Sequence, residues 1–405
     1  MTRPRESGAV LLALLLTILF AATTAFAQET GGGNWVLLDA ASTTLVKRGT
    51  DAMYNLRYNE ADSIFTQLVQ LRPEHPAGYF LLALVDWWRI TPNQSVGSKV
   101  DRYSESFNSR IDKTIEICDK MLEQNPNDIV GLFFKGSALG YRARLKVENL
   151  SGTSILDWVS AATEGKDAYD IIQRCQRLAP SNSDILLGSG LYNYLGAYIP
   201  EKYPIARNAV GFLPPGDKKI GLSMLRIAGK RAQYAATEAK YSLLEILVTM
   251  ENDFAGAIQV GEELHAQYPS NPVFERFLAK AYYMNSDWLH ADTLYVDLLT
   301  RVKNRQSGYE LSSARQALYY LGDIRVRRHM PDDALRFLQE ADKISRRFGE
   351  EESGWNILSQ LKMGFAYDLL GKRQEALAQY KRVLDMDDYG NSHQMAQKYM
   401  AQPYN

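Results

Sequence analysis

The sequence predicts an all-α protein, a right-handed superhelical solenoid of about seven to eight stacked helical hairpins with insertions. Small and aromatic residues recur along the chain at one set of offsets, and the interval from Ala257 to Ala291 equals 34 residues, the length of one two-helix repeat. Prolines stand where the recurring segments are expected to end. The 24 tyrosines among 405 residues suit an array of helices with many packed crevices between them.

The first 27 residues have the pattern of a signal peptide. Arg3 and Arg5 give a positive start, residues 8–22 form an apolar run, and residues 25–27 supply a small-x-small cleavage site. The apolar run is short for a membrane span, so an uncleaved anchor is the less favoured alternative. Residues 28–40 follow as an expected flexible linker. We therefore expect an exported protein, periplasmic or secreted and soluble after cleavage, with peripheral association with the outer membrane as a further option.

The repeat places a small residue in the first helix of a hairpin 12 positions before an alanine in the second. The four pairs are Gly49 and Ala61, Ala279 and Ala291, Gly322 and Ala334, and Gly364 and Ala376. We expect these small residues to let the two helices approach closely. An aromatic residue or leucine follows each alanine by four positions, on the same helix face, and is expected to fill the space between neighbouring hairpins.

Prolines are expected to end the second helices, because proline cannot continue a helix. These prolines are Pro73, Pro126, Pro180 and Pro269. The intervals between them exceed one repeat, so the second and third units are expected to carry insertions or lengthened first helices, and the last interval holds two units and a loop. The expected insertions are residues 87–100, 146–165, 199–217 and 303–311.

By these residues the chain resembles the tetratricopeptide-repeat family over residues 41–390. The resemblance implies a solenoid whose concave face receives partners, and it implies no catalytic residue. Residues 185–230, with Gly188-Ser189-Gly190 and Ile199-Pro200, resemble the inclusion-body-clearance branch of this family, which includes eukaryotic members and exported bacterial ones. Residues 391–405 are expected to form a capping helix and tail, since the exposed end of a solenoid needs a cover.

A search for chemical motifs predicts no catalytic residue, no metal site and no cofactor. The five histidines form no His-Glu-x-x-His pair, and Cys-x-x-Cys, phosphate-loop and Gly-x-Ser-x-Gly motifs are absent from the sequence. Cys118 and Cys175 are interpreted as buried free thiols, with a disulfide as the open alternative. The net charge of −1 argues against a nucleic-acid partner.

Projection of the repeat onto the concave face gives the candidate partner-binding residues. Arg276 and Lys280 lie one helical turn apart and are placed to pair with a carboxylate of a partner. A solvated basic pair without a specific role is the alternative. The other candidates are Tyr283, Tyr319, Asp323 and Asp368, with Trp87 near the rim and Tyr194 on an aromatic stretch of the same face.

We therefore expect a non-catalytic scaffold in the cell envelope that binds a protein or peptide on its concave groove. The alternative is a module that binds a glycan or another envelope polymer through aromatic residues near Trp87 and Pro200. A third class is an enzyme whose site lies in the insertions. The sequence leaves open whether the insertions fill the groove.

Overall fold

The computed structural model describes residues 38–91, 97–148, 155–203, 207 and 214–405. The expected signal peptide and most of the expected linker lie outside these residues. Within them the chain forms 17 α-helices and one short π-helix, and no strand. None of these helices combines the length and the apolar character that a bilayer crossing needs.

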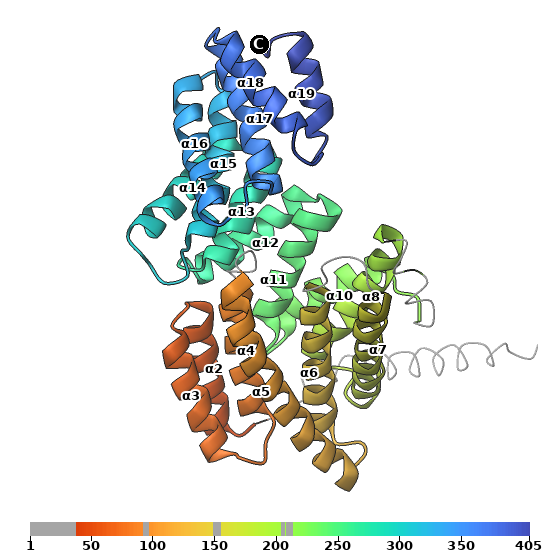
Figure 1. The fold of residues 1–405 in the computed structure, drawn as a ribbon. Coiled ribbons are helices and arrows are strands. Elements are labelled where there is room, and N and C mark those ends of the chain that lie inside the picture. The colour runs from red at the N-terminus through yellow and green to blue at the C-terminus, as the bar shows by residue number, and fades with distance from the viewer. Residues whose placement is uncertain (1–37, 92–96, 149–154, 204–206, 208–213) are drawn as a thin grey trace, which may run out of the picture.

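The described helices pair into successive hairpins that stack side by side (Figure 1). The first four hairpins are α2 (Ala40–Tyr54) with α3 (Tyr58–Leu71), α4 (Ala77–Ile90) with α5 (Gly97–Gln124), α6 (Ile129–Glu148) with α7 (Ile155–Leu178), and α8 (Ile185–Lys202) with α10 (Lys218–Arg231). The next four are α11 (Ala236–Ile246), extended by the π-helix η2 (Leu247–Glu251), with α12 (Phe254–Gln267), α13 (Pro272–Met284) with α14 (Trp288–Lys303), α15 (Leu311–Arg327) with α16 (Pro331–Arg347), and α17 (Gly354–Leu369) with α18 (Arg373–Leu384). A last helix, α19 (Ser392–Ala401), packs against α17 and α18. The predicted all-α solenoid is thus confirmed.

The ends of the helices follow from local sequence. Helices α3, α5, α7 and α12 each end two residues before a proline, as predicted. At the starts of α12, α13 and α14, the side chains of Asp253, Asn271 and Asp287 accept hydrogen bonds from free backbone N–H groups of the first turn. Asn252 and Ser286, in the turns before α12 and α14, adopt positive φ angles of 55° and 63°. These short polar turns reverse the chain between the two helices of a hairpin.

The insertions differ in part from expectation. Residues 303–311 connect α14 to α15, as predicted. The extra length of the second and third units lies mainly in their second helices, because α5 and α7 extend to 28 and 24 residues. The expected loop at 199–217 begins as helix, since α8 continues through Pro200 to Lys202, and most of its remainder lies outside the described residues.

The predicted small residues do lie at the contact between the two helices of a hairpin. Ala61, Ala291, Ala334 and Ala376 have no exposed surface. The glycines, however, face the residue 16 positions later: a Cβ atom on Gly322 would lie 2.6 Å from Cγ of Leu338, and Gly49 and Gly364 face Phe65 and Tyr380 in the same way. The aromatic residue or leucine therefore packs inside its own hairpin, which corrects the expected position between hairpins. The reason is that the ring or the isobutyl group needs the space left by the missing side chain.

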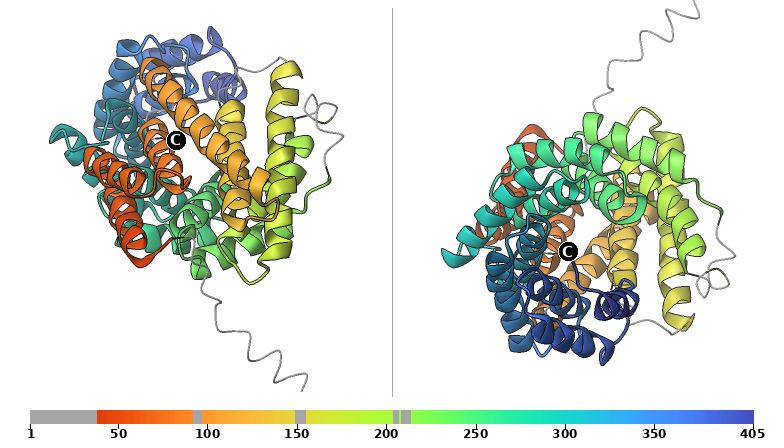
Figure 2. Two further views of the ribbon diagram at one scale, coloured as in Figure 1. Left: turned by 90° about the horizontal axis from the view of Figure 1, so that it is seen from below. Right: turned by 90° about the horizontal axis from the view of Figure 1, so that it is seen from above.

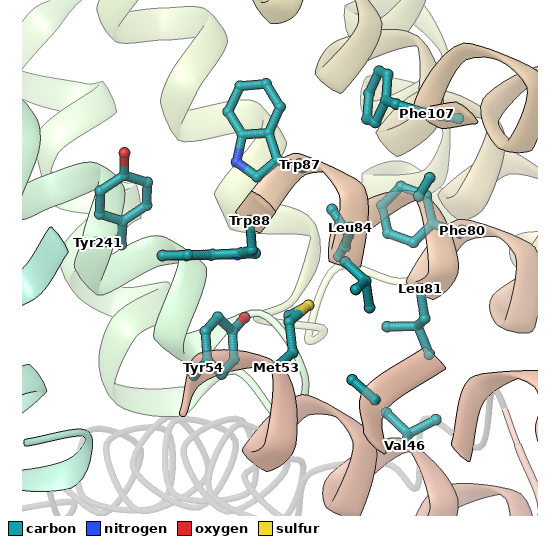
Figure 3. Packing of buried hydrophobic residues seen from close by; sticks show 14 of the residues in the cluster. Val46, Met53, Tyr54, Phe80, Leu81, Leu84, Trp87, Trp88, Phe107 and Tyr241 are labelled. Carbon is teal, nitrogen blue, oxygen red and sulfur yellow. The ribbon is translucent and has the colours of Figure 1, made fainter. Parts of the chain in front are cut away.

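The solenoid winds into a ring, so that its start meets its middle (Figure 2). The Asn271 side-chain amide donates to the backbone carbonyl of Tyr54 over 2.9 Å, and the Ser307 hydroxyl donates to that of Leu56. One hydrophobic core extends from α2 to α13, and a second extends from α13 to α19. In the first core Trp88 lies between Tyr54 and Tyr241, with ring centroids 5.3 and 5.1 Å apart (Figure 3). The first core thus joins side chains of helices that lie far apart in the sequence.

Candidate functional site

The first helices of the hairpins line the inside of the ring, and three of them, α13, α15 and α17, bring polar side chains together. We call this set the C-terminal inner face. It consists of Arg276, Lys280, Tyr283, Asp323, Arg327 and Lys362. Four of the candidates predicted from the sequence belong to it, and Arg327 and Lys362 are additions.

Asp323 is the centre of the C-terminal inner face. Its side chain is fully buried, accepts a hydrogen bond from Nε of Arg327 at 2.6 Å and forms an ion pair with Nζ of Lys362 at 2.5 Å. The Tyr283 hydroxyl donates to the same carboxylate. Burial acts to raise the pKa of Asp323, but the two cations outweigh it and hold this pKa below its usual value. The carboxylate is therefore ionised and already bound by its own chain.

Arg276 and Lys280 differ from the other cations because, among the residues that the structure describes, no carboxylate pairs with either. One contact of Arg276 is long, from Nη1 to the Ser313 hydroxyl at 3.4 Å, and its Nε finds no acceptor in the described residues. Both side chains are half-buried, and burial lowers the pKa of each. The C-terminal inner face thus holds four cations and one carboxylate, in a chain whose net charge is −1.

Tyr319 and Asp368, two further candidates, are occupied by contacts within the chain. Tyr319 is 7% exposed and packs against Trp355 with ring centroids 5.5 Å apart. The Asp368 side chain is buried and accepts from Arg373 at 2.8 Å and from the Tyr380 hydroxyl at 2.7 Å. The two residues border the C-terminal inner face and leave little surface for a partner.

The structure corrects the expected positions of Trp87 and Tyr194. Both are fully buried, so neither offers a surface to a partner. Trp87 packs edge-on against Tyr141 with ring centroids 5.4 Å apart, and the guanidinium of Arg144 lies 5.0 Å from its ring. The Tyr194 hydroxyl donates to Glu251 at 2.6 Å. The stacking of successive hairpins accounts for Trp87, because Phe107 of α5 and Tyr141 and Arg144 of α6 cover a ring that a single helix would expose.

One of the two residues that the projection of the repeat missed has a recognisable spacing in the sequence. Arg327 follows Asp323 by four positions, a spacing typical of an ion pair on one helix. Lys362 belongs to the next hairpin, and a contact between hairpins has no fixed sequence spacing. Its pairing with Asp323 could be found only from the fold.

No group of three or more histidine, cysteine, aspartate or glutamate side chains gathers to hold a metal ion in the described ranges. Cys118 and Cys175 are buried free thiols, as predicted. Burial raises the pKa of each thiol to about 12, which keeps both protonated at neutral pH. The described residues thus provide no activated cysteine.

The family model of the tetratricopeptide repeat matches residues 313–388, which include the last two hairpins. Residues 313–388 are thus similar to tetratricopeptide repeats. No curated protein matches the sequence. Among solved structures, the chain is similar to a tetratricopeptide repeat protein from Parabacteroides merdae, with 11% identity, coverage of 79% of this chain and 99% of that one, and a TM-score of 0.30.

The chain is also similar to yeast Tom70, with 11% identity, coverage of 89% of this chain and 95% of that one, and a TM-score of 0.24. Human IFIT1, solved as a dimer with m7Gppp-AAAA, has 14% identity over 82% of this chain and 68% of that one, with a TM-score of 0.32. Likenesses at this level carry no information about function.

Proposed function

We propose that this protein is a non-catalytic scaffold that binds an acidic segment of a partner protein on the C-terminal inner face. The observation that carries the proposal is the pair Arg276 and Lys280, two half-buried cations for which the described residues supply no carboxylate. A carboxylate of a partner would supply it, and charge-assisted hydrogen bonds to such a pair are stronger than neutral ones.

The rigidity of the face supports the same function. Helices α13, α15 and α17 are held together by the contacts to Asp323 and by the second hydrophobic core. A bound segment would therefore meet groups that are already in position. Arg327 and Lys362 pair with Asp323, so Arg276 and Lys280 are the two cations of this face that would attract an acidic segment and speed its encounter.

The glycan-binding alternative loses two of the aromatic residues on which it depended, and keeps Tyr203, which is 43% exposed. Trp87 and Tyr194 have no exposed surface, and Tyr192 stacks on Tyr169 with ring centroids 3.6 Å apart. These aromatic rings are used for packing, so we do not propose a glycan as the ligand.

We further propose that the protein acts in the cell envelope, periplasmic or secreted. The support is the leader pattern of residues 1–27 and the resemblance of residues 185–230 to the inclusion-body-clearance branch, which has exported members. Cell fractionation with an antibody, and N-terminal sequencing of the isolated protein, test this location. Recovery in the cytoplasm with residues 1–27 retained would contradict it.

A peptide titration tests the binding proposal. A fluorescein-labelled peptide of glutamates around one alanine should bind the wild-type protein and raise the fluorescence anisotropy. Lys280→Glu should weaken this binding at least about tenfold, since it replaces attraction by repulsion in a half-buried site. The matched control is Lys343→Glu on the outer helix α16, where the side chain is 67% exposed, and this variant should bind like the wild type.

Two results would contradict the proposal. One is equal affinity of the Lys280→Glu and wild-type proteins for the acidic peptide. The other is preferential binding of a single-stranded oligonucleotide of the same charge, which would assign the positive field to a nucleic acid.

A further inference from the structure

Residues 402–405 follow α19 and lie against the inner side of α17. The Tyr404 ring stacks on the Phe365 ring, with centroids 4.4 Å apart and planes 1° from parallel. The backbone N–H of Tyr404 donates to Oδ2 of Asp368 at 3.0 Å. The Tyr404 ring also packs edge-on against the Tyr399 ring of α19, with centroids 5.3 Å apart. Two ring contacts and one main-chain hydrogen bond therefore hold this segment, which is how an extended peptide would bind to a helical surface.

We call the surface formed by Phe365 and Asp368, on which Tyr404 packs, the seat of Tyr404. This seat adjoins the C-terminal inner face. Lys362, which pairs with Asp323, also lies 5.0 Å from the Phe365 ring on which Tyr404 stacks. Burial raises the pKa of Tyr404, and the Asp323 carboxylate raises it further while Arg327 acts in the opposite direction. The Tyr404 side chain is thus close enough to Asp323 and Arg327 for their charges to affect its pKa.

Within residues 402–405, Tyr404 is half-buried, whereas Gln402, Pro403 and Asn405 are exposed. The anchoring contact belongs to α19, where Nη2 of Arg373 donates to the Met400 carbonyl at 2.7 Å. Residues 402–405 can therefore leave the face while α19 stays in place.

We infer that Tyr404 occupies the seat of an aromatic side chain of the acidic partner segment, and that residues 402–405 leave this seat when the partner binds. The inference rests on the proposed function and specifies its ligand: the partner segment carries a tyrosine or phenylalanine among its carboxylates. The ring would stack on Phe365 while the carboxylates reach Lys362, Lys280 and Arg276. The segment 402–405 then lowers the affinity for such partners, because part of the binding surface is occupied.

The test compares two labelled peptides, both rich in glutamate, one with a central tyrosine and one with alanine in its place. Tyr404→Ala should bind the tyrosine peptide about tenfold more tightly than the wild type does, since the seat is vacated. Its affinity for the alanine peptide should not change. Tyr404→Phe keeps the stacking ring and should behave like the wild type, and Asn405→Ala is the control for a change in the exposed part of the segment.

A second measurement needs no variant. Hydrogen–deuterium exchange of the Tyr404 amide in the wild-type protein should become faster when the tyrosine peptide is added, because the hydrogen bond to Asp368 is lost. The alanine peptide should leave that exchange unchanged.

The possible failures are distinguishable. If both peptides bind and Tyr404→Ala changes neither affinity or both equally, the inference is overturned while the proposed function stands. Slower or unchanged exchange of the Tyr404 amide with the tyrosine peptide overturns it as well. If neither peptide binds the wild type or Tyr404→Ala, the proposed function fails and the inference fails with it.

Discussion

The indole N–H of Trp88 donates to Oε1 of Glu238 over 2.6 Å, although the two residues are 150 positions apart in the chain. The Tyr54 hydroxyl donates to the same oxygen at 3.0 Å. Helices α2, α4 and α11 are thus joined at one buried carboxyl group whose pKa is raised by burial. This link helps to close the first part of the solenoid.

Trp88→Phe should lower the free energy of unfolding by about 1–3 kcal/mol, because it leaves a buried oxygen with one donor fewer. A double-mutant cycle with Glu238→Leu, which removes the acceptor, measured by chemical denaturation, isolates the contact from the loss of ring volume. A coupling energy near zero would show that the two residues do not hold the ring closed.

The contact between glycine and the residue 16 positions later predicts a contrast between two glycines. Gly322→Ala should destabilise the protein by roughly 1–3 kcal/mol, because the added methyl group would collide with the buried Leu338. Gly165→Ala, in α7, meets no atom within 4 Å and should stabilise the helix by up to about 1 kcal/mol. Equal melting temperatures of the two variants would mean that the hairpin geometry is wrong.

The hairpin architecture was predictable because its signals are local. The spacing from Gly322 to Ala334 depends on two helices adjacent in sequence, and a proline acts on the helix just before it. The partner of a glycine was predicted wrongly, since Leu338 lies on the same helix face as Ala334 and spacing alone does not show which of them meets Gly322. The closing of the ring was not predictable at all, because the contact of Trp88 with Glu238 has no periodic signal.

Glu275 predicts a pH dependence of stability. Its side chain is buried, Oε2 accepts from the Tyr309 hydroxyl at 2.6 Å, and burial raises its pKa from 4.5 to about 7. The folded state therefore binds this proton more tightly than the unfolded state does. The resulting stabilisation is complete below pH 4.5 and is lost as the pH rises through about 7, on the order of 3 kcal/mol in total.

Glu275→Gln removes this dependence, so the stability of the wild type relative to the variant should fall between pH 4.5 and 7. Thermal unfolding of both proteins across this range measures the difference. Glu340→Gln, whose side chain is 56% exposed, is the control and should track the wild type at every pH. A constant difference between wild type and Glu275→Gln would disprove the raised pKa.

Lys280 predicts opposite effects on stability and binding. Lys280→Met removes a half-buried cation that lacks a carboxylate and keeps most of the apolar stem, so it should stabilise the fold by roughly 1 kcal/mol. The same change should weaken the binding of an acidic peptide. Calorimetry and the peptide titration measure the two effects, with Lys343→Met as the exposed control. A variant that loses stability, or that keeps full affinity, would show that Lys280 serves the fold and not a partner.

The sequence predicts the site only as a set of positions on the inner faces of the first helices of the hairpins. Arg276 and Lys280 were found because the repeat places them on the first helix of a hairpin. The same projection selected Asp323 without showing that Lys362 already neutralises it, since the pairing joins two hairpins. It also selected Trp87, which α5 and the next hairpin bury.

The most direct measurement is the site at which a photoreactive acidic peptide crosslinks to the full-length protein, mapped by mass spectrometry. The structure predicts crosslinks to α13, α15 and α17, reduced by Lys280→Glu and retained in Lys343→Glu. Crosslinks confined to α2–α12 or to the outer helices α14, α16 and α18 would contradict a partner site on the C-terminal inner face.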